Sequence, residues 1–426
     1  MARNLENGLN SGLRRSIARG LGSGDVFTLA PLDLRFAQQK TLDSRITFTR
    51  ASSGTYVGSD GLIKTATTNE ARFDHNPTTG ESLGLLVEEQ RTNLLLRSEE
   101  FDNASWTQNN ITVSANNTTA PNGLTTAEKI AETSANNEHN ALQAVTVASN
   151  TSYTLTCYAK KGERNILALS PTAPGVSNYY TWFNLDTGTI GTSASGNTAT
   201  ITSVGNGWYR CSISRTTGAS QTTINVKLGI SNADSTSSYT GDGTSGIYLW
   251  GAQLEAGSFP TSYIPTTSAT VTRSADVASI TGANFSSWYR QDEGTVALDF
   301  SLPTTAGNTA IASFFQAAAP STNRHSIRQG NSIITTAGSQ VANFTNQTAA
   351  VNTRSKIAYG YKVDDFFQIL NGTTSASDTS GAVPASIDQL DIGKVEGASI
   401  YSNGPIRRLT YWPSRLANSV LQEITR

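Results

Sequence analysis

The stretches YTLTCYAKK (residues 153–161) and WYRCSIS (residues 208–214) decide the fold class of this chain. In both, apolar side chains recur at every second position, which is the pattern of a β-strand that buries one face. Cys157 falls on the same side as Leu155, and Cys211 takes the equivalent place in the second stretch. We therefore predict that both cysteines are small core residues. A disulfide bond between them would require the two strands to be neighbours.

The same alternation surrounds these two strands. Further strand candidates lie at residues 141–147, 164–170, 179–185, 198–204, 223–231 and 246–254. Turn residues such as Asn206-Gly207 separate them. Short strands at this spacing favour a sandwich or jelly roll over βαβ units. We predict one sandwich over residues 94–266.

A second series of strands is predicted at residues 293–426. TVALDFSL alternates cleanly, KIAYGYKV and FFQIL follow, and Asn371-Gly372 is a strong hairpin turn. Ser414 is predicted to cap the final helix. The buried stripe of that helix is expected to be Leu416, Val420, Leu421 and Ile424. The fold class is thus all-β, with tandem β-sandwiches.

Two shorter segments flank the first sandwich. Residues 26–93 hold short strand signals, with Ser59-Asp60-Gly61 as a hairpin turn, but few apolar residues. We expect a small β-rich collar that packs on a neighbouring domain. Residues 267–292 are rich in Ser, Thr and Gly and are predicted to be a linker.

Residues 1–25 differ from the rest of the chain. Apolar residues recur every four positions: Leu5, Leu9, Leu13, Ile17 and Leu21. On a helix this spacing places them along one face that rotates gradually around the axis. We predict an anchor that orders when it docks on a partner. The alternative is a frayed tail, because glycine at this density weakens a free helix.

Composition excludes several classes of partner. Charged residues are 15% of the 426 positions and the net charge is −1. We therefore expect no electrostatic attraction to nucleic acid or to an anionic membrane. No apolar run has the length of a membrane span, and the first residues lack the apolar core of a secretory signal. We therefore expect synthesis in a cytoplasm and no membrane insertion.

Three strings resemble parts of bacteriophage virion proteins. ITFTRASSGTYVGSDGLIKTATTNEARFDHNPTTGESLGLLVEEQRTNLLLRSEEFDNASW (residues 46–106) is similar to a module that precedes a carbohydrate-binding-module-like jelly roll. NGWYRCSIS and IYLWGAQLEAGSFPTSYIPTT (residues 247–267) are similar to closing strands of that jelly roll. Residues 293–426 look like a concanavalin A or laminin G-like sandwich.

The resemblance implies a structural virion protein of the head spike, head fibre or tail fibre type. It would attach to phage head or tail proteins through its N-terminus, assemble as a homotrimer and bind host surface polysaccharide. A purely architectural decoration protein without a ligand is the alternative. Weak single sites would suit such repeated presentation, because several copies engage one surface together.

Jelly rolls of this kind often hold a structural calcium ion between their first and last strands. Phe101-Asp102 matches the opening acid only loosely, and Leu249 or Trp250 stands where an acidic ligand is usual. We therefore predict no metal and no other cofactor. Other acids that could serve are Asp234, Asp242 and Glu255.

Catalysis needs a constellation that the sequence does not display. His75, His139 and His325 lie in different segments, without metal-ligand spacing or a nucleophile motif. Adjacent acids such as Glu88-Glu89 point to opposite faces of a strand, which is poor evidence for a glycosidase pair. We expect no enzymatic activity. A depolymerase whose carboxylates come from distant strands is the less favoured alternative.

Sugar binding requires only an exposed aromatic ring beside hydroxyl-binding groups. In NYYTWFNLDTG (residues 178–188), Tyr180, Trp182 and Asn184 share one face of the predicted strand, and Phe183 lies on the other, with the core. We predict the first three as the carbohydrate platform, and an oligomer contact or an ordinary surface pair as its alternative. Trp208, Trp250 and Trp412 are assigned to packing.

Overall fold

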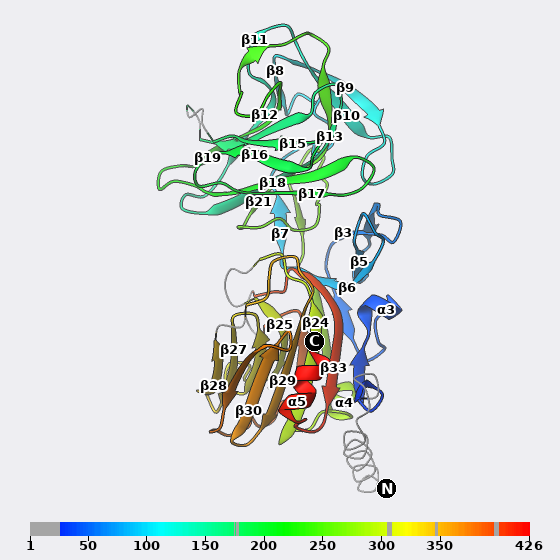
Figure 1. Cartoon of the computed structure of the whole chain (residues 1–426), viewed down its shortest axis with the longest axis vertical. Coiled ribbons are helices and arrows are strands. Elements are labelled where there is room, and N and C mark those ends of the chain that lie inside the picture. Colours follow the sequence, from blue (N-terminus) through cyan, green and yellow to red (C-terminus); the bar gives the residue numbers. More distant parts are fainter. Residues whose placement is uncertain (1–25, 174, 176–178, 305–308, 346–347, 396–399) are drawn as a thin grey trace.

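The computed structural model describes residues 26–173, 175, 179–304, 309–345, 348–395 and 400–426. Its strands form two sandwiches, one above the other, joined by a narrow stem (Figure 1). The prediction of an all-β chain with tandem sandwiches is confirmed. None of the described helices is long and apolar enough to cross a membrane.

The upper, jelly-roll sandwich consists of two antiparallel sheets, and its strands lie between residues 107 and 256. The first sheet has the order β17 (Thr198–Ser203), β18 (Trp208–Thr216), β13 (Ser152–Lys161), β21 (Gly246–Ala256), β10 (Ala127–Glu132), β9 (Ile111–Thr118). The second has the order β16 (Thr189–Ser193), β15 (Thr181–Asn184), β14 (Ile166–Thr172), β19 (Thr223–Ser231), β12 (His139–Thr146), β8 (Thr107–Asn109). A short pair, β11 (Asn136–Asn137) and β20 (Tyr239–Thr240), caps its upper end.

The core of the jelly roll contains the residues that the alternation selected. β13 and β18 are neighbours, and their register places Cys157 directly opposite Cys211. Both cysteines are fully buried and free, among Leu155, Ile213 and other core residues. The prediction that they are small core residues is therefore confirmed, and they are not bonded although their strands are adjacent.

The lower sandwich also consists of two sheets. One has the order β31 (Thr374–Asp378), β30 (Asp365–Leu370), β29 (Ser355–Lys362), β24 (Glu293–Phe300), β33 (Gly404–Trp412), β6 (Ser82–Val87), β5 (Arg72–His75), and β1 (Leu32–Leu34) also pairs with β33. The other has the order β2 (Thr47–Thr49), β23 (Val277–Thr281), β32 (Gln389–Ile392), β25 (Ala310–Phe315), β26 (Arg324–Arg328), β27 (Asn331–Thr336), β28 (Ser339–Thr345). One continuous apolar cluster fills the space between them.

The structure divides the chain differently from the predicted collar and linker. Strands of residues 26–93 join both sheets of the lower sandwich, and β23 of the predicted linker lies between β2 and β32. The lower sandwich is thus built from segments on both sides of the jelly roll. The physical reason is that a short hairpin such as β5–β6 is marginal alone and gains stability when β33 extends it into a larger sheet.

Local turn and helix predictions had mixed outcomes. Ser59-Asp60-Gly61 connects β3 (Gly54–Val57) to β4 (Ile63–Ala66), and Asn371-Gly372 connects β30 to β31, as predicted. The final helix α5 (Asn418–Ile424) buries Leu421 and Ile424 beside Trp412. It begins after Ala417, so the prediction that Ser414 caps it is wrong. Short helices α3 (Phe36–Gln39) and α4 (Ala283–Ser286) pack on the lower sandwich.

The stem is a strand pair, β7 (Arg91–Asn93) with β22 (Val271–Arg273), where the chain enters and leaves the jelly roll. Beside it lies a buried ion network. Its members come from four separate stretches of sequence and are almost completely buried: Arg50, Arg72, Glu88, Arg273 and Asp276. Buried charges are tolerated only when they are paired and hydrogen-bonded, so this network fixes the joint in one arrangement.

Candidate functional site

The predicted carbohydrate platform lies on the outer face of the sheet that contains β15. Phe183 is part of the jelly-roll core, whereas Tyr180 and Trp182 pack with Ile166 and Ala168 in a separate small cluster. The assignment of faces from the sequence is therefore correct. The tryptophan and tyrosine rings are tilted against each other, with centroids 5.5 Å apart.

The rings are not open to a ligand, and here the prediction needs correction. Tyr180 is 4% exposed and Trp182 is 8% exposed, and the indole Nε1 of Trp182 donates a hydrogen bond to the carbonyl of Thr236 (3.2 Å). The segment after β19 covers this face, which strand alternation cannot reveal. Asn184 is a turn residue, because its side-chain oxygen accepts hydrogen bonds from the amides of Asp186 and Thr187. A sugar cannot stack on these rings as they stand.

Polar groups continue along the same outer face. The ammonium group of Lys227 pairs with Glu138 at 2.6 Å and lies 5.5 Å from the ring centre of Tyr180. Burial, with the Glu138 carboxylate beside it, raises the pKa of Tyr180 well above its usual range. Ser170 is opposite Lys227 in the strand register, and its buried hydroxyl has no partner among the described residues. These groups suit hydroxyl recognition, but the covered rings limit access to them.

The histidines are placed as structural residues. Nδ1 of His75 contacts the carbonyl of Val57 at 3.0 Å, and His139 contacts two backbone carbonyls. His325 lies in the lower core, with its Nδ1 2.8 Å from the hydroxyl of Tyr359. Burial lowers the pKa of His325 to about 3, so it is neutral at physiological pH. The described residues contain no group of three His, Cys, Asp or Glu side chains that could hold a metal ion.

Near the positions considered for calcium, Glu128 of β10 is the acid that lies opposite β21. Glu128 pairs with Leu249 in the strand register, and its Oε2 accepts hydrogen bonds from the amides of Phe101 (2.5 Å) and Asp102 (3.2 Å). Burial, together with the Asp102 carboxylate, raises the pKa of Glu128 to about 8. The described residues around Glu128 do not supply the three acidic or histidine side chains that a metal site would need.

The other three acids considered for calcium are held in separate contacts. Asp234 accepts from Thr192, Asp242 accepts from Thr244 and Ser245, and Glu255 accepts from Thr261. They do not converge on one point. The anchor residues Leu5, Leu9, Leu13, Ile17 and Leu21 lie outside the described residues.

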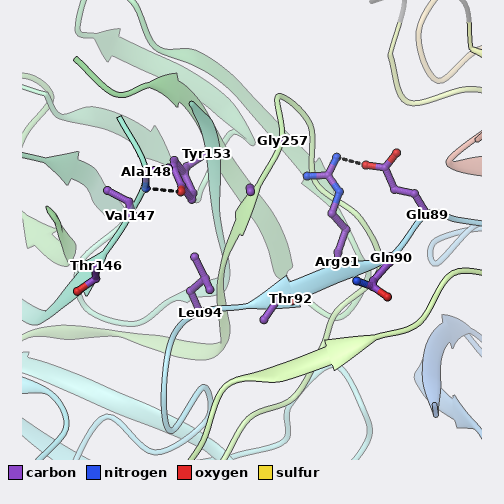
Figure 2. Close-up of a pocket in the computed structure, with 11 residues that line it drawn as sticks. Glu89, Gln90, Arg91, Thr92, Leu94, Thr146, Val147, Ala148, Tyr153 and Gly257 are labelled. Carbon is purple, nitrogen blue, oxygen red and sulfur yellow. Dashed lines mark hydrogen bonds and ion pairs between the residues drawn. The ribbon is translucent and has the colours of Figure 1, made fainter. Parts of the chain in front are cut away.

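A pocket of about 590 Å³ opens where the stem meets the jelly roll (Figure 2). One side is formed by the stem and the other by the β12–β13 turn and the end of β21. Sequence analysis missed this pocket because its walls come from distant segments. They are Glu89, Gln90, Arg91, Thr92, Leu94, Thr146, Val147, Ala148, Tyr153, Ala256 and Gly257.

Arg91 is the charged centre of this junction pocket. Its Nη2 pairs with Oε1 of Glu89 at 2.5 Å, and its guanidinium carbon lies 4.9 Å from the ring centre of Phe259. Figure 2 shows the guanidinium group between the Glu89 carboxylate and Gly257. The side chain is 7% exposed. Among the described residues, Nε and Nη1 of Arg91 have no hydrogen-bond acceptor.

Comparisons with known proteins bear on the fold alone. No family model matches the chain, and no curated protein matches it. The carbohydrate-binding module CBM40 of the Ruminococcus gnavus IT-sialidase, solved with α2,6-sialyllactose, is 11% identical, with 34% of this chain and 88% of that chain covered and a TM-score of 0.29. A putative carbohydrate-binding protein from Bacteroides ovatus is 12% identical, with coverages of 67% and 79% and a TM-score of 0.24.

The mouse laminin α1 chain, domains LG4–5, is 10% identical, with coverages of 68% and 88% and a TM-score of 0.25. All three similarities are too low to assign a ligand to this chain. The fold class therefore stands on the sheets described above, and the function must be argued from the arrangement of the chain itself.

Proposed function

We propose that this chain is a non-enzymatic bacteriophage virion appendage, of the spike or fibre type, which binds polysaccharide on the host surface. The observation that carries the proposal is that the start of the described chain lies on the lower sandwich, whereas the jelly roll lies at the opposite end of the protein. The first described residue, Val26, is fixed on the lower sandwich, where its carbonyl accepts a hydrogen bond from Nε1 of Trp412 (3.0 Å). The jelly roll stands beyond the stem (Figure 1).

This arrangement supports a division between attachment and display. Residues 1–25 lead into the lower sandwich, so an anchor made by them would hold that sandwich to the particle and leave the jelly roll outward. The buried ion network at the stem would keep the display domain in a fixed direction. The strings that resemble virion proteins supply several members of this network, among them Arg50, Arg72 and Glu88.

Deletion of residues 1–25 tests the attachment. We expect the deleted protein to remain soluble and folded, because residues after position 25 supply extensive apolar cores in both sandwiches, and to be absent from purified particles. Particles that incorporate it at the normal level would contradict the anchor. Light scattering on both forms tests the proposed homotrimer, and a monomer mass at micromolar concentration for both would exclude it.

The architectural alternative shares the anchor but has no ligand. It is favoured by the covered rings of Tyr180 and Trp182, which leave no aromatic platform on that face. The junction pocket, whose volume of about 590 Å³ is in the range of small-molecule sites, favours a ligand. Release of reducing ends from host polysaccharide would contradict both and identify a depolymerase.

A further inference from the structure

We propose that copies of this chain join through open strand edges, with β17 of one jelly roll pairing with residues 143–146 of β12 in the next copy. The inference rests on the proposed homotrimer and deepens it, because it names the surfaces that hold the copies together. Three observations carry it: main-chain groups left open on both edges, the absence of charge on both edges, and the position of the edges on opposite sides of the jelly roll.

The first open edge belongs to β12. β19 pairs with all eight residues of this strand, whereas β8 pairs only with residues 140–142 on the other side. The amide of Val147 donates to the carbonyl of Thr222, toward β19 (2.9 Å). In an antiparallel pair, successive residues direct their main-chain groups to opposite sides. Ala144 and Thr146 therefore direct their main-chain N–H and C=O groups away from β19, where no described strand pairs with them.

An apolar groove follows this open stretch. It is lined by four consecutive residues of β12, 143–146, and because side chains alternate between the faces of a strand, such a run marks its edge. Leu94 and Leu142 supply apolar surface beside it, and none of the lining residues is charged. Ala144 and Thr146 are exposed. The groove thus offers main-chain partners and apolar contacts to an incoming strand, which is how sheet edges bind extended segments.

The second open edge is β17, which pairs with β18 along all six of its residues without a bulge. The amide of Val204 donates to the carbonyl of Trp208 (2.9 Å), so by the same alternation Ala199 and Ile201 direct their main-chain groups away from β18. No described strand is hydrogen-bonded to β17 on that side. Two such residues on each edge can exchange about four main-chain hydrogen bonds.

Neither edge is protected against pairing. Charged residues, proline and bulges normally keep an exposed strand edge from pairing with another chain. The sequence of β17, TATITS, has none of these, and neither does the open stretch of β12, QAVT. Ile190, on the neighbouring strand β16, is 41% exposed, so both surfaces also carry apolar side chains. Two copies can therefore approach here without burying a charge.

The positions of the edges select another copy as the partner. β17 lies beside β16 at one side of the jelly roll, whereas β12 lies next to β8 and β9 at the other side. One chain therefore cannot pair its own two edges, but each copy can give β17 to a second copy and accept β17 from a third. A contact between two different surfaces closes into a ring when the rotation allows it, and a ring of this kind gives the proposed homotrimer.

Charge placed on the two edges tests the contact in the full chain. Thr146 and Thr202 are exposed, so substitutions there should leave the circular dichroism spectrum unchanged. We expect Thr146→Lys with Thr202→Lys to raise the dissociation constant of the oligomer about tenfold or more in light scattering, because like charges then face each other. Thr146→Glu with Thr202→Lys should restore most of the affinity. Thr374→Lys, at an exposed position of the edge strand β31 in the lower sandwich, is the matched control.

Cysteine pairs test the same contact directly. We expect Ala144→Cys, combined with either Ala199→Cys or Ile201→Cys, to link the copies into covalent trimers on oxidation in at least one of the two combinations. The native Cys157 and Cys211 do not interfere, because both are fully buried. Absence of links in both combinations would overturn the inference. Covalent dimers from Ala144→Cys alone would also overturn it, because β12 would then pair with itself.

The outcomes separate this inference from the proposed function. A homotrimer whose dissociation constant is the same in all the charge variants would overturn the edge contact and leave the proposed assembly intact. A monomer of the unaltered chain would overturn both the contact and the homotrimer, and host-cell binding by that monomer would still leave the adhesin.

Discussion

Arg72 and Asp276 lie 204 positions apart in the chain and form an ion pair in which both side chains are fully buried. Arg72 also pairs with Glu88 at 2.7 Å. The pair therefore connects the segment before the jelly roll to the segment after it. Burial alone would raise the pKa of Glu88, but the guanidinium groups of Arg273 and Arg72 outweigh burial and hold it at about 2.

We predict that Arg72→Met destabilises the chain by about 3–5 kcal/mol, because removal of one partner leaves buried carboxylates without sufficient positive charge. Urea denaturation measures the change in the free energy of unfolding. Arg354→Met is the control, since Arg354 pairs with Asp299 at the surface and should contribute about 1 kcal/mol or less. Equal losses in the two variants would show that the network does not support the joint.

Much of the fold was predictable from local patterns. Alternation located β13 and β18, and Asn371-Gly372 located a hairpin, because these signals depend on neighbours in sequence. The contribution of residues 26–93 to the lower sandwich was not predictable, because the pairing of β6 with β33 joins residues more than 300 positions apart. The ion pairs that Arg72 forms were not predictable from the sequence for the same reason.

The candidate site was predictable only in part. Strand parity placed Tyr180 and Trp182 on the outer face correctly. It could not show that the carbonyl of Thr236 covers the indole, because that segment follows a different strand. The junction pocket needs three distant segments at once, and nothing in the sequence distinguishes Arg91 from other arginines beside acids.

Trp182→Ala tests the corrected assignment of the aromatic pair. Because the indole is buried and hydrogen-bonded, we expect the substitution to lower the free energy of unfolding of the jelly roll by about 3 kcal/mol. If Trp182 were instead an exposed sugar contact, its substitution would weaken host binding and leave the free energy of unfolding unchanged. Unchanged stability together with lost host binding would restore Trp182 as a sugar contact.

The jelly roll should lose stability as the pH rises from about 4.5 to about 8. The pKa of Glu128 is about 8 in the folded chain, against an ordinary value of 4.5. Its contribution to stability is therefore fully present below about pH 4.5 and is lost as the pH rises through 8. We expect the melting temperature to fall as the pH rises from about 4.5 to about 8, and Glu128→Gln to reduce that fall. A fall of the same size in Glu128→Gln would assign the pH dependence to other groups. Glu100→Gln, at a partly exposed position, is the control.

Both thiols should be inert in the native chain. Cys157 and Cys211 are fully buried, and burial raises the pKa of each thiol well above its ordinary value, so little thiolate forms. We expect a thiol reagent to label them only as fast as the jelly roll unfolds, and both to be labelled completely in denaturant. Rapid labelling without denaturant, or a disulfide found by mass spectrometry, would contradict this placement.

The central claim is that the chain binds host polysaccharide, and binding of the intact protein to host cells tests it most directly. Fluorescently labelled full-length protein should bind the cells saturably, and purified host polysaccharide should displace it. A polysaccharide from a strain that the particle does not infect should displace it less. Failure of the intact oligomer to bind host cells at micromolar concentration would contradict the claim and favour a purely architectural protein.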